Sequence, residues 1–164
     1  MKAFGLMDEQ ATAAVMEIPA PEPGSGEVRV RVLNSSVNGF DVSVAKGLLR
    51  GMMEHRYPVV GGKDFAGVVE SVGDAVTDLA PGDEVAGVTP YEPVLSRGAF
   101  AELIVVPASG FIQRRPPDLD LERAASVGLA AITALASVDA VEASDGDAVL
   151  IVGAAGGVGV YAVQ

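Results

Sequence analysis

The most constraining feature of the sequence is an apolar run that ends in a cluster of glycines. Residues 148–152 (AVLIV) carry no polar side chain, and Gly153, Gly156, Gly157 and Gly159 follow them. A continuous apolar run of this length is typical of a parallel strand that is covered on both faces. Glycines at the end of such a strand allow a tight turn and the close approach of another backbone or a ligand. The pattern therefore predicts a buried parallel strand, a glycine turn and the start of a helix.

The spacing of these glycines has two interpretations. Residues 157–162 (GVGVYA) fit the G-x-G-x-x-A pattern that places a dinucleotide pyrophosphate at the N-terminus of a helix. Tight backbone packing explains a glycine-rich turn equally well, and the spacing alone does not separate the two. A phosphate-binding P-loop is excluded because no Gly-Lys-Ser/Thr follows.

Strands dominate the part of the chain that precedes this turn. In residues 28–32 the side chains of Val28, Val30 and Val32 alternate with arginines, which is the period of a half-buried strand. Turns that contain glycine or proline separate the other predicted strands, and short strands at this spacing predict a compact, partly open β-barrel. These other strands are residues 2–6, 14–18, 65–72, 84–88 and 99–106.

A helical pattern replaces the strands after Pro116 and Pro117. Apolar residues recur at helical spacing through the alanine-rich residues 121–136, and Asp118 or Asp120 is available to cap the N-terminus. The spacing predicts one largely buried helix that connects the barrel to the apolar strand.

Composition excludes several classes of function. The net charge of −11 argues against a nucleic-acid partner, because such interfaces are built from clustered lysine and arginine. The chain has no cysteine, which rules out disulfides and thiolate metal sites. No apolar run approaches the ~20 residues of a membrane span, so we expect no membrane partner and a cytoplasmic protein.

Five segments resemble, in order and spacing, the zinc-free quinone oxidoreductases of the medium-chain dehydrogenase/reductase superfamily. GDAVLIVGAAGGVGVYAVQ (146–164) resembles their nucleotide-binding turn, and VNGFDVSVAKG (37–47) resembles their V-N-x-x-D segment. YPVVGGKDFAGVVESVG (57–73), PGDEVAG (81–87) and GAFAELIVVP (98–107) match further family signatures. The resemblance extends over nearly the whole chain.

The resemblance implies both a fold and an activity. Residues 1–118 would form a mainly β, GroES-like, partly open barrel that holds the substrate. Residues 119–164 would form the connecting helix and the truncated start of an α/β Rossmann domain that binds NADPH or NADH, with NADPH favoured. The implied activity is zinc-independent hydride transfer to a small-molecule substrate, namely a quinone, an enone or a similar activated double bond.

The resemblance also points to individual site residues. Asn38 and Asp41 would lie in the cleft near the nicotinamide and are candidate catalytic residues; the alternative is that they only bond to the backbone of their own turn. The residues implied to bind the cofactor are Gly153, Gly156, Gly157, Val158 and Gly159.

No metal site is expected. Zinc-dependent relatives use a cysteine and the histidine of a G-H-E segment, whereas this chain has no cysteine and carries Gly62, Lys63 and Asp64 at that place. Lys63 would repel a cation, and it is a third candidate catalytic residue because its ammonium can polarise a substrate carbonyl. A surface or ion-paired lysine is the alternative, and Asp64 is expected to tie down its loop.

The only histidine and its neighbours also have two interpretations. His55 has a side chain suited to a general acid, although a lone histidine in a polar loop is commonly just solvated. Met52, Met53 and Tyr57 would line the substrate entrance or simply pack within their loop.

The segment after Asp147 holds only one strand and the beginning of one helix, so we expect a fragment that lacks most of the cofactor domain. Each of the four residues 149–152 would lose about 1.5 to 3 kcal/mol if it stayed exposed. We therefore expect this segment to pair with the same segment of a second copy, giving a homo-oligomer, or to fold back on the barrel. The alternatives to an enzyme fragment are a non-catalytic binding or assembly module and a zinc-type alcohol dehydrogenase, the latter disfavoured by the missing ligands.

Overall fold

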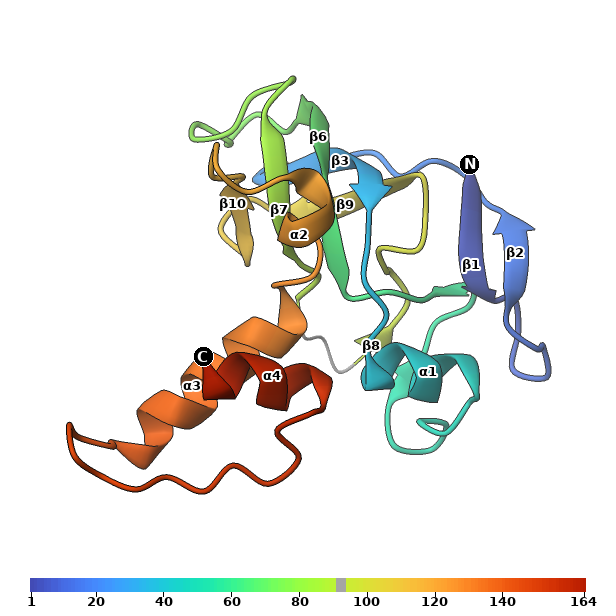
Figure 1. Ribbon diagram of the computed structural model, residues 1–164. Coiled ribbons are helices and arrows are strands. Elements are labelled where there is room, and N and C mark those ends of the chain that lie inside the picture. The colour runs from blue at the N-terminus through green and yellow to red at the C-terminus, as the bar shows by residue number, and fades with distance from the viewer. Residues whose placement is uncertain (91–93) are drawn as a thin grey trace.

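The computed structural model describes residues 1–90 and 94–164, and it divides into a sheet-rich part and a helical C-terminal part (Figure 1). Its strands are β1 (Lys2–Leu6), β2 (Ala14–Glu17), β3 (Glu27–Asn34), β4 (Glu54–His55), β5 (Val59–Val60), β6 (Asp64–Val72), β7 (Glu84–Val88), β8 (Val94–Leu95), β9 (Leu103–Pro107) and β10 (Ile112–Arg114). Its helices are α1 (Gly39–Ala45), α2 (Leu121–Ala124), α3 (Leu129–Val141) and α4 (Gly157–Val163).

The largest sheet has the strand order β10-β7-β6-β3-β9, and all its pairs are antiparallel. The alternation of residues 28–32 has the predicted effect, because Val28 and Val30 are completely buried while Arg31 is exposed. Two smaller sheets accompany it, in the orders β2-β1-β5 and β4-β8. The sheets stay open, in agreement with the predicted partly open, mainly β fold.

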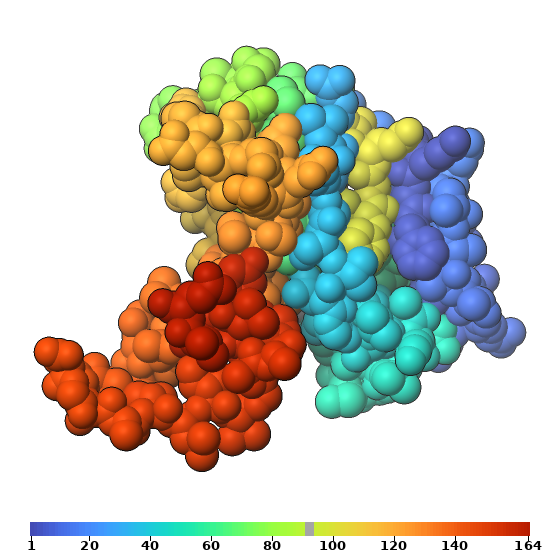
Figure 2. All heavy atoms as spheres, viewed as in Figure 1, coloured from blue at the N-terminus to red at the C-terminus, as the bar shows by residue number. Residues whose placement is uncertain are grey.

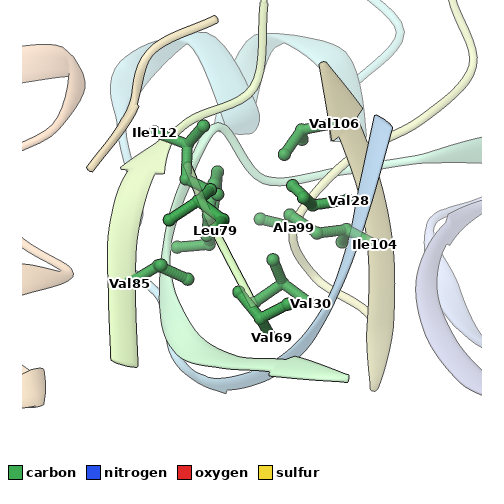
Figure 3. Packing of buried hydrophobic residues seen from close by; sticks show 10 residues of the cluster. Val28, Val30, Val69, Leu79, Val85, Ala99, Ile104, Val106 and Ile112 are labelled. Atoms are coloured by element: carbon green, nitrogen blue, oxygen red, sulfur yellow. The ribbon is translucent and has the colours of Figure 1, made fainter. Parts of the chain in front are cut away.

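The core lies on the inner face of the large sheet. Figure 3 shows valines of β3, β6, β7 and β9 converging with Leu79 and Ala99 from the loops. Phe65 of β6 is the largest completely buried side chain in this cluster. Because buried apolar surface contributes roughly 25 cal/mol per Å², this cluster stabilises the sheet region.

Most predicted strands lie where the sequence places them, but residues 99–106 form a strand only from Leu103 onward. The amide of Ala99 donates to Gly62 O, and that of Phe100 donates to Gly61 O. These residues therefore bridge to the loop before β6, and only the residues after them pair with β3.

The prediction of a single buried helix over residues 121–136 is wrong in two respects. The helix is interrupted between α2 and α3, and only Ala130 and Ala134 of α3 are buried. The cap of α2 is as predicted, since the Asp120 side chain accepts a hydrogen bond from the Arg123 amide at 2.7 Å.

The buried parallel strand predicted for residues 148–152 is absent. This segment has no regular structure, and Leu150 and Val152 are 87% and 89% exposed. A parallel strand needs neighbouring strands, and no described segment of the chain pairs with it. Helix α4 instead returns to α3, as Figures 1 and 2 show, and the Tyr161 hydroxyl donates to Ser126 O at 3.1 Å.

Candidate functional site

The buried carboxylate of Asp64 joins three segments of the chain. Its Oδ1 atom accepts a hydrogen bond from the Leu129 amide at 2.6 Å, at the start of α3. Its Oδ2 atom accepts from Asn38 Nδ2 at 2.9 Å and from the Ser36 hydroxyl. Asp64 was expected to tie down its own loop, but it begins strand β6 and holds the segment around Ser36 and Asn38 instead. It also caps α3 at long range, because a helix leaves its first amides without internal acceptors.

Gly128 lets this carboxylate approach the helix. A Cβ atom at Gly128 would lie 2.3 Å from Asp64 Oδ1, far inside van der Waals contact. The space taken by the Asp64 carboxylate therefore requires glycine at this position.

Asn38 and Asp41 are linked at the start of α1. The Asn38 amide donates to Asp41 Oδ2 at 2.7 Å, while the Asn38 side chain is directed to Asp64. Asp41 is buried, and burial raises the pKa of its carboxyl. The hydrogen bonds from Asn38 and the charge of Lys63 lower this pKa, whereas the charge of Asp64 adds to the increase.

Lys63 lies beside Asp41, so the structure brings all three predicted catalytic residues together. Lys63 Nζ donates to Pro90 O at 2.8 Å and lies 5.6 Å from the centre of the Phe40 ring. Lys63 and Asp41 line one narrow cavity between the large sheet and α1. Their catalytic roles remain predictions, because proximity alone shows no chemistry.

Thr89 is a residue that the sequence analysis missed. It follows β7, is buried and lines the same cavity as Asp41 and Lys63. A polar residue directly after a predicted strand was the available signal.

A second, apolar hollow adjoins Lys63 and Thr89 on the side of α3, where Phe111, Leu129 and Ile132 line it. Lys63 and Thr89 thus border both a polar cavity and an apolar surface.

His55 is not part of this arrangement. It lies in β4, with its Nδ1 atom 2.8 Å from Met53 O and its ring 5.9 Å from that of Tyr57. The ring is partly buried, so the interpretation as a freely solvated side chain is wrong. Met52 is 78% exposed and packs little. Tyr57 lines a second hollow, which does not include Asp41 but shares Val60 and Arg97 with the Asp41 cavity.

The glycine turn supports the packing interpretation at two positions, while cofactor binding stays a prediction. Gly153 has a left-handed φ of +80°, and a Cβ at Gly159 would lie 2.2 Å from Gly153 O, so both positions serve the backbone. A Cβ at Gly157 would meet nothing within 4 Å, and Gly156 caps α4. The exposed amides at Gly157 and Val158 therefore border open space at a helix start, which fits the diphosphate of a dinucleotide.

The described residues contain neither a metal-binding cluster nor a helix that could span a membrane. They contain no group of three or more histidine, aspartate or glutamate side chains arranged to hold a metal ion. None of the helices within residues 1–90 and 94–164 combines the length and apolar character needed to cross a membrane.

Comparison with known proteins agrees with this architecture. Residues 24–116 match the family model of the alcohol dehydrogenase GroES-like domain. The chain is 32% identical over 155 residues to the chloroplastic quinone-oxidoreductase homolog of Spinacia oleracea, covering 91% of this chain and 46% of the relative. It is 37% identical over 160 residues to the pikromycin polyketide synthase component PikAII of Streptomyces venezuelae, covering 95% of this chain and 4% of the relative.

A solved structure shows the same likeness. The quinone oxidoreductase from Coxiella burnetii superimposes with a TM-score of 0.84 at 27% identity, covering 99% of this chain and 52% of that one. The chain therefore spans about half the length of the quinone oxidoreductases it matches. The chain belongs to the alcohol dehydrogenase GroES-like domain family, and the proteins that it resembles over about half of their length include quinone oxidoreductases.

Proposed function

We propose that this chain provides the acceptor-binding part of an NAD(P)H-dependent reductase that transfers hydride to a quinone, an enone or a similar activated double bond. The observation that carries the proposal is the meeting of Asp41, Lys63 and Thr89 beside an apolar hollow. An apolar acceptor with one polarised oxygen needs such a surface, with polar groups at one end. In this proposal residues 1–118 bind the acceptor, and residues 119–164 begin the cofactor domain.

The roles of the residues follow from charge. The reduced nicotinamide, when bound, supplies the hydride. Negative charge then develops on the acceptor oxygen, and the ammonium of Lys63 stabilises it. Lys63 lies at the border of the apolar hollow, where its ammonium can face the acceptor oxygen. Residues 156–159 hold the diphosphate, and NADPH is the favoured cofactor.

We further propose that the reaction is independent of zinc. Lys63 stands where zinc-dependent relatives place a histidine, and its positive charge opposes a cation at that position. Asp64, the neighbouring carboxylate, is already committed to Leu129, Asn38 and Ser36.

Two measurements test this function. Calorimetric titration with NADPH reports cofactor binding, and NADPH oxidation with a quinone or an enone in the presence of a chelator reports zinc-independent reduction. Lys63→Gln should lower the rate by about 100-fold, the effect of removing one transition-state donor. Lys46→Gln, at an exposed lysine after α1, is the matched control and should be neutral. Activity that chelation abolishes and zinc restores contradicts the mechanism.

The leading alternative is a non-catalytic binding or assembly module. The observation that favours it is the exposed apolar surface formed by residues 148–152 with α3 and α4. We propose that this surface pairs with a second copy, and sedimentation of the chain should give a dimer. A dimer that binds no NADPH would support the assembly module over the enzyme.

A further inference from the structure

Two buried polar atoms near the candidate site lack a protein partner. Asp41 Oδ1 and Thr89 Oγ1 are shielded from solvent and accept or donate no hydrogen bond to any described residue. Asp41 is 4% exposed and Thr89 is 6% exposed. Buried polar groups are almost always hydrogen-bonded, to protein or to ordered water. Two such atoms on residues that line one cavity therefore indicate a small polar ligand there.

The size of the cavity identifies that ligand. Its volume is about 60 Å³. One water needs roughly 10 to 15 Å³ of such volume, so the cavity holds about four to six waters and is too small for a quinone ring. Its walls between the polar residues are mostly aliphatic or backbone, as at Val44, Val60 and Leu95. A narrow cavity of this kind suits a short file of waters.

The cavity also reaches the surface. Arg97 and Glu27 line it as well, and they form an ion pair of 3.4 Å in which the Arg97 side chain is 65% exposed. The cavity that Asp41 and Thr89 line therefore extends to the solvent-exposed ion pair of Arg97 and Glu27. We propose that waters in this cavity carry protons from the surface at Arg97 through Asp41 to Thr89, which borders the acceptor hollow, and from Thr89 to the acceptor.

The proposed reaction needs this supply, so the inference rests on the proposed function. Hydride addition to an enone forms a carbon–hydrogen bond at the β-carbon and breaks the π bond. The electron pair then resides on an enolate, which takes one proton at the α-carbon to give the saturated ketone. The reductant provides the hydride, and solvent must provide the proton. The Thr89 hydroxyl gives its proton to the α-carbon and takes another from Asp41, and Asp41 is reprotonated through the water file.

The charges around Asp41 permit this role. Burial raises the pKa of the Asp41 carboxyl, and the negative charge of Asp64 acts in the same direction. Lys63 and the hydrogen bonds from Asn38 oppose the increase. The resulting carboxyl holds its proton to a higher pH than an exposed aspartate does, as a proton donor requires.

The first test uses the chain alone, without cofactor. Water-to-protein cross-relaxation in NMR should connect long-lived waters to the methyl groups of Val44 and Thr89. The chemical shift of the Asp41 carboxyl carbon reports the protonation of this group, and the Asp41→Asn variant assigns the signal. The pKa obtained from this shift should lie above that of an ordinary aspartate. Thr89→Val keeps the shape of the side chain and should remove the water contact and shift this titration. Thr77→Val, at an exposed turn, should change neither. A dry cavity, or an Asp41 that titrates like an exposed carboxyl, overturns the inference.

The second test measures turnover with NADPH and an enone. Thr89→Val should slow the reaction about 10- to 100-fold, leave NADPH binding unchanged and increase the solvent isotope effect, while Thr77→Val matches the wild type. If Thr89→Val changes neither the rate nor the solvent isotope effect, the proton path is rejected. The proposed function is not affected by that result. If NADPH does not bind at all, the proposed function fails, and the NMR measurement still decides whether the cavity is hydrated.

Discussion

The sheet region and the C-terminal segment (residues 119–164) contain similar aliphatic residues. These residues are buried in the sheet region but largely exposed in residues 148–152. Val28 and Phe65 are completely buried in the large sheet, whereas Leu150 and Val152 are almost fully exposed. The antiparallel strands find their partners in neighbouring segments of the same chain. The apolar residues 148–152 find none among the described residues. Apolar composition therefore produces burial only where matching strands are present to pair with it.

The two regions also differ in how they are attached. The sheet region has a continuous core, seen in Figure 3. The start of α3 is held to it by the Asp64–Leu129 hydrogen bond, and α4 is held near α2 by the Tyr161–Ser126 bond. The helices α3 and α4 pack against each other, but no cluster of buried apolar side chains like that of the large sheet forms between them in the described residues.

The largest predicted effect concerns the core itself. Phe65→Ala should lower the free energy of unfolding by about 3 to 5 kcal/mol, because it leaves a cavity among completely buried side chains. Leu150→Ala is the matched control in the C-terminal segment and should change stability by less than about 0.5 kcal/mol. Urea denaturation measures both. Equal losses at the two positions would show that residues 148–152 are buried in solution.

The next effect concerns the attachment of α3. Gly128→Ala should lower the free energy of unfolding by about 1 to 3 kcal/mol, because its methyl group displaces the buried Asp64 carboxylate from the Leu129 amide. Gly157→Ala provides the comparison, since a methyl group there meets no neighbouring atom. It should leave thermal stability unchanged and weaken NADPH binding. A Gly128→Ala variant as stable as the wild type contradicts the account of Asp64 as a cap.

A smaller effect concerns pH and Asp41. Because its pKa is raised in the folded state, the folded chain binds more protons than the unfolded chain between the ordinary value of 3.8 and the raised value. Stability is therefore lost as the pH rises through this window. Asp41→Asn removes this dependence, and urea titrations across the window should show a flatter profile. An identical profile in the variant would mean that Asp41 titrates normally.

The smallest effect concerns Asp83 at the surface of the sheet region. The Ala80 amide and then the Arg114 guanidinium hold the pKa of this carboxyl below its ordinary value. The sign is opposite to that of Asp41: the stabilisation is present above pH 3.8 and is lost as the pH falls through the lowered value. Asp83→Asn should reduce the acid sensitivity of thermal unfolding only slightly. A large change would indicate a partner other than Arg114.

The sequence predicted the strands of the sheet region well, because their signals are local. The alternation of Val28 and Val30 and the turns around Gly73 and Gly82 suffice to place β3, β6 and β7. The resemblance brought Asn38, Asp41 and Lys63 forward as site residues, and the structure places them together. Thr89 escaped notice because a single threonine after a strand carries no distinctive pattern.

The sequence by itself determined which faces of the strands are apolar, where turns fall and where glycine can admit a ligand, since each depends on residues close together in the chain. Only the tertiary structure decided that the predicted helix breaks before Leu129, through a hydrogen bond that spans 65 positions to Asp64. It alone also decided that residues 148–152 stay uncovered and that Asp41 and Thr89 share one cavity. Periodicity reports what a segment can bury, whereas burial itself requires a partner that only the folded chain supplies.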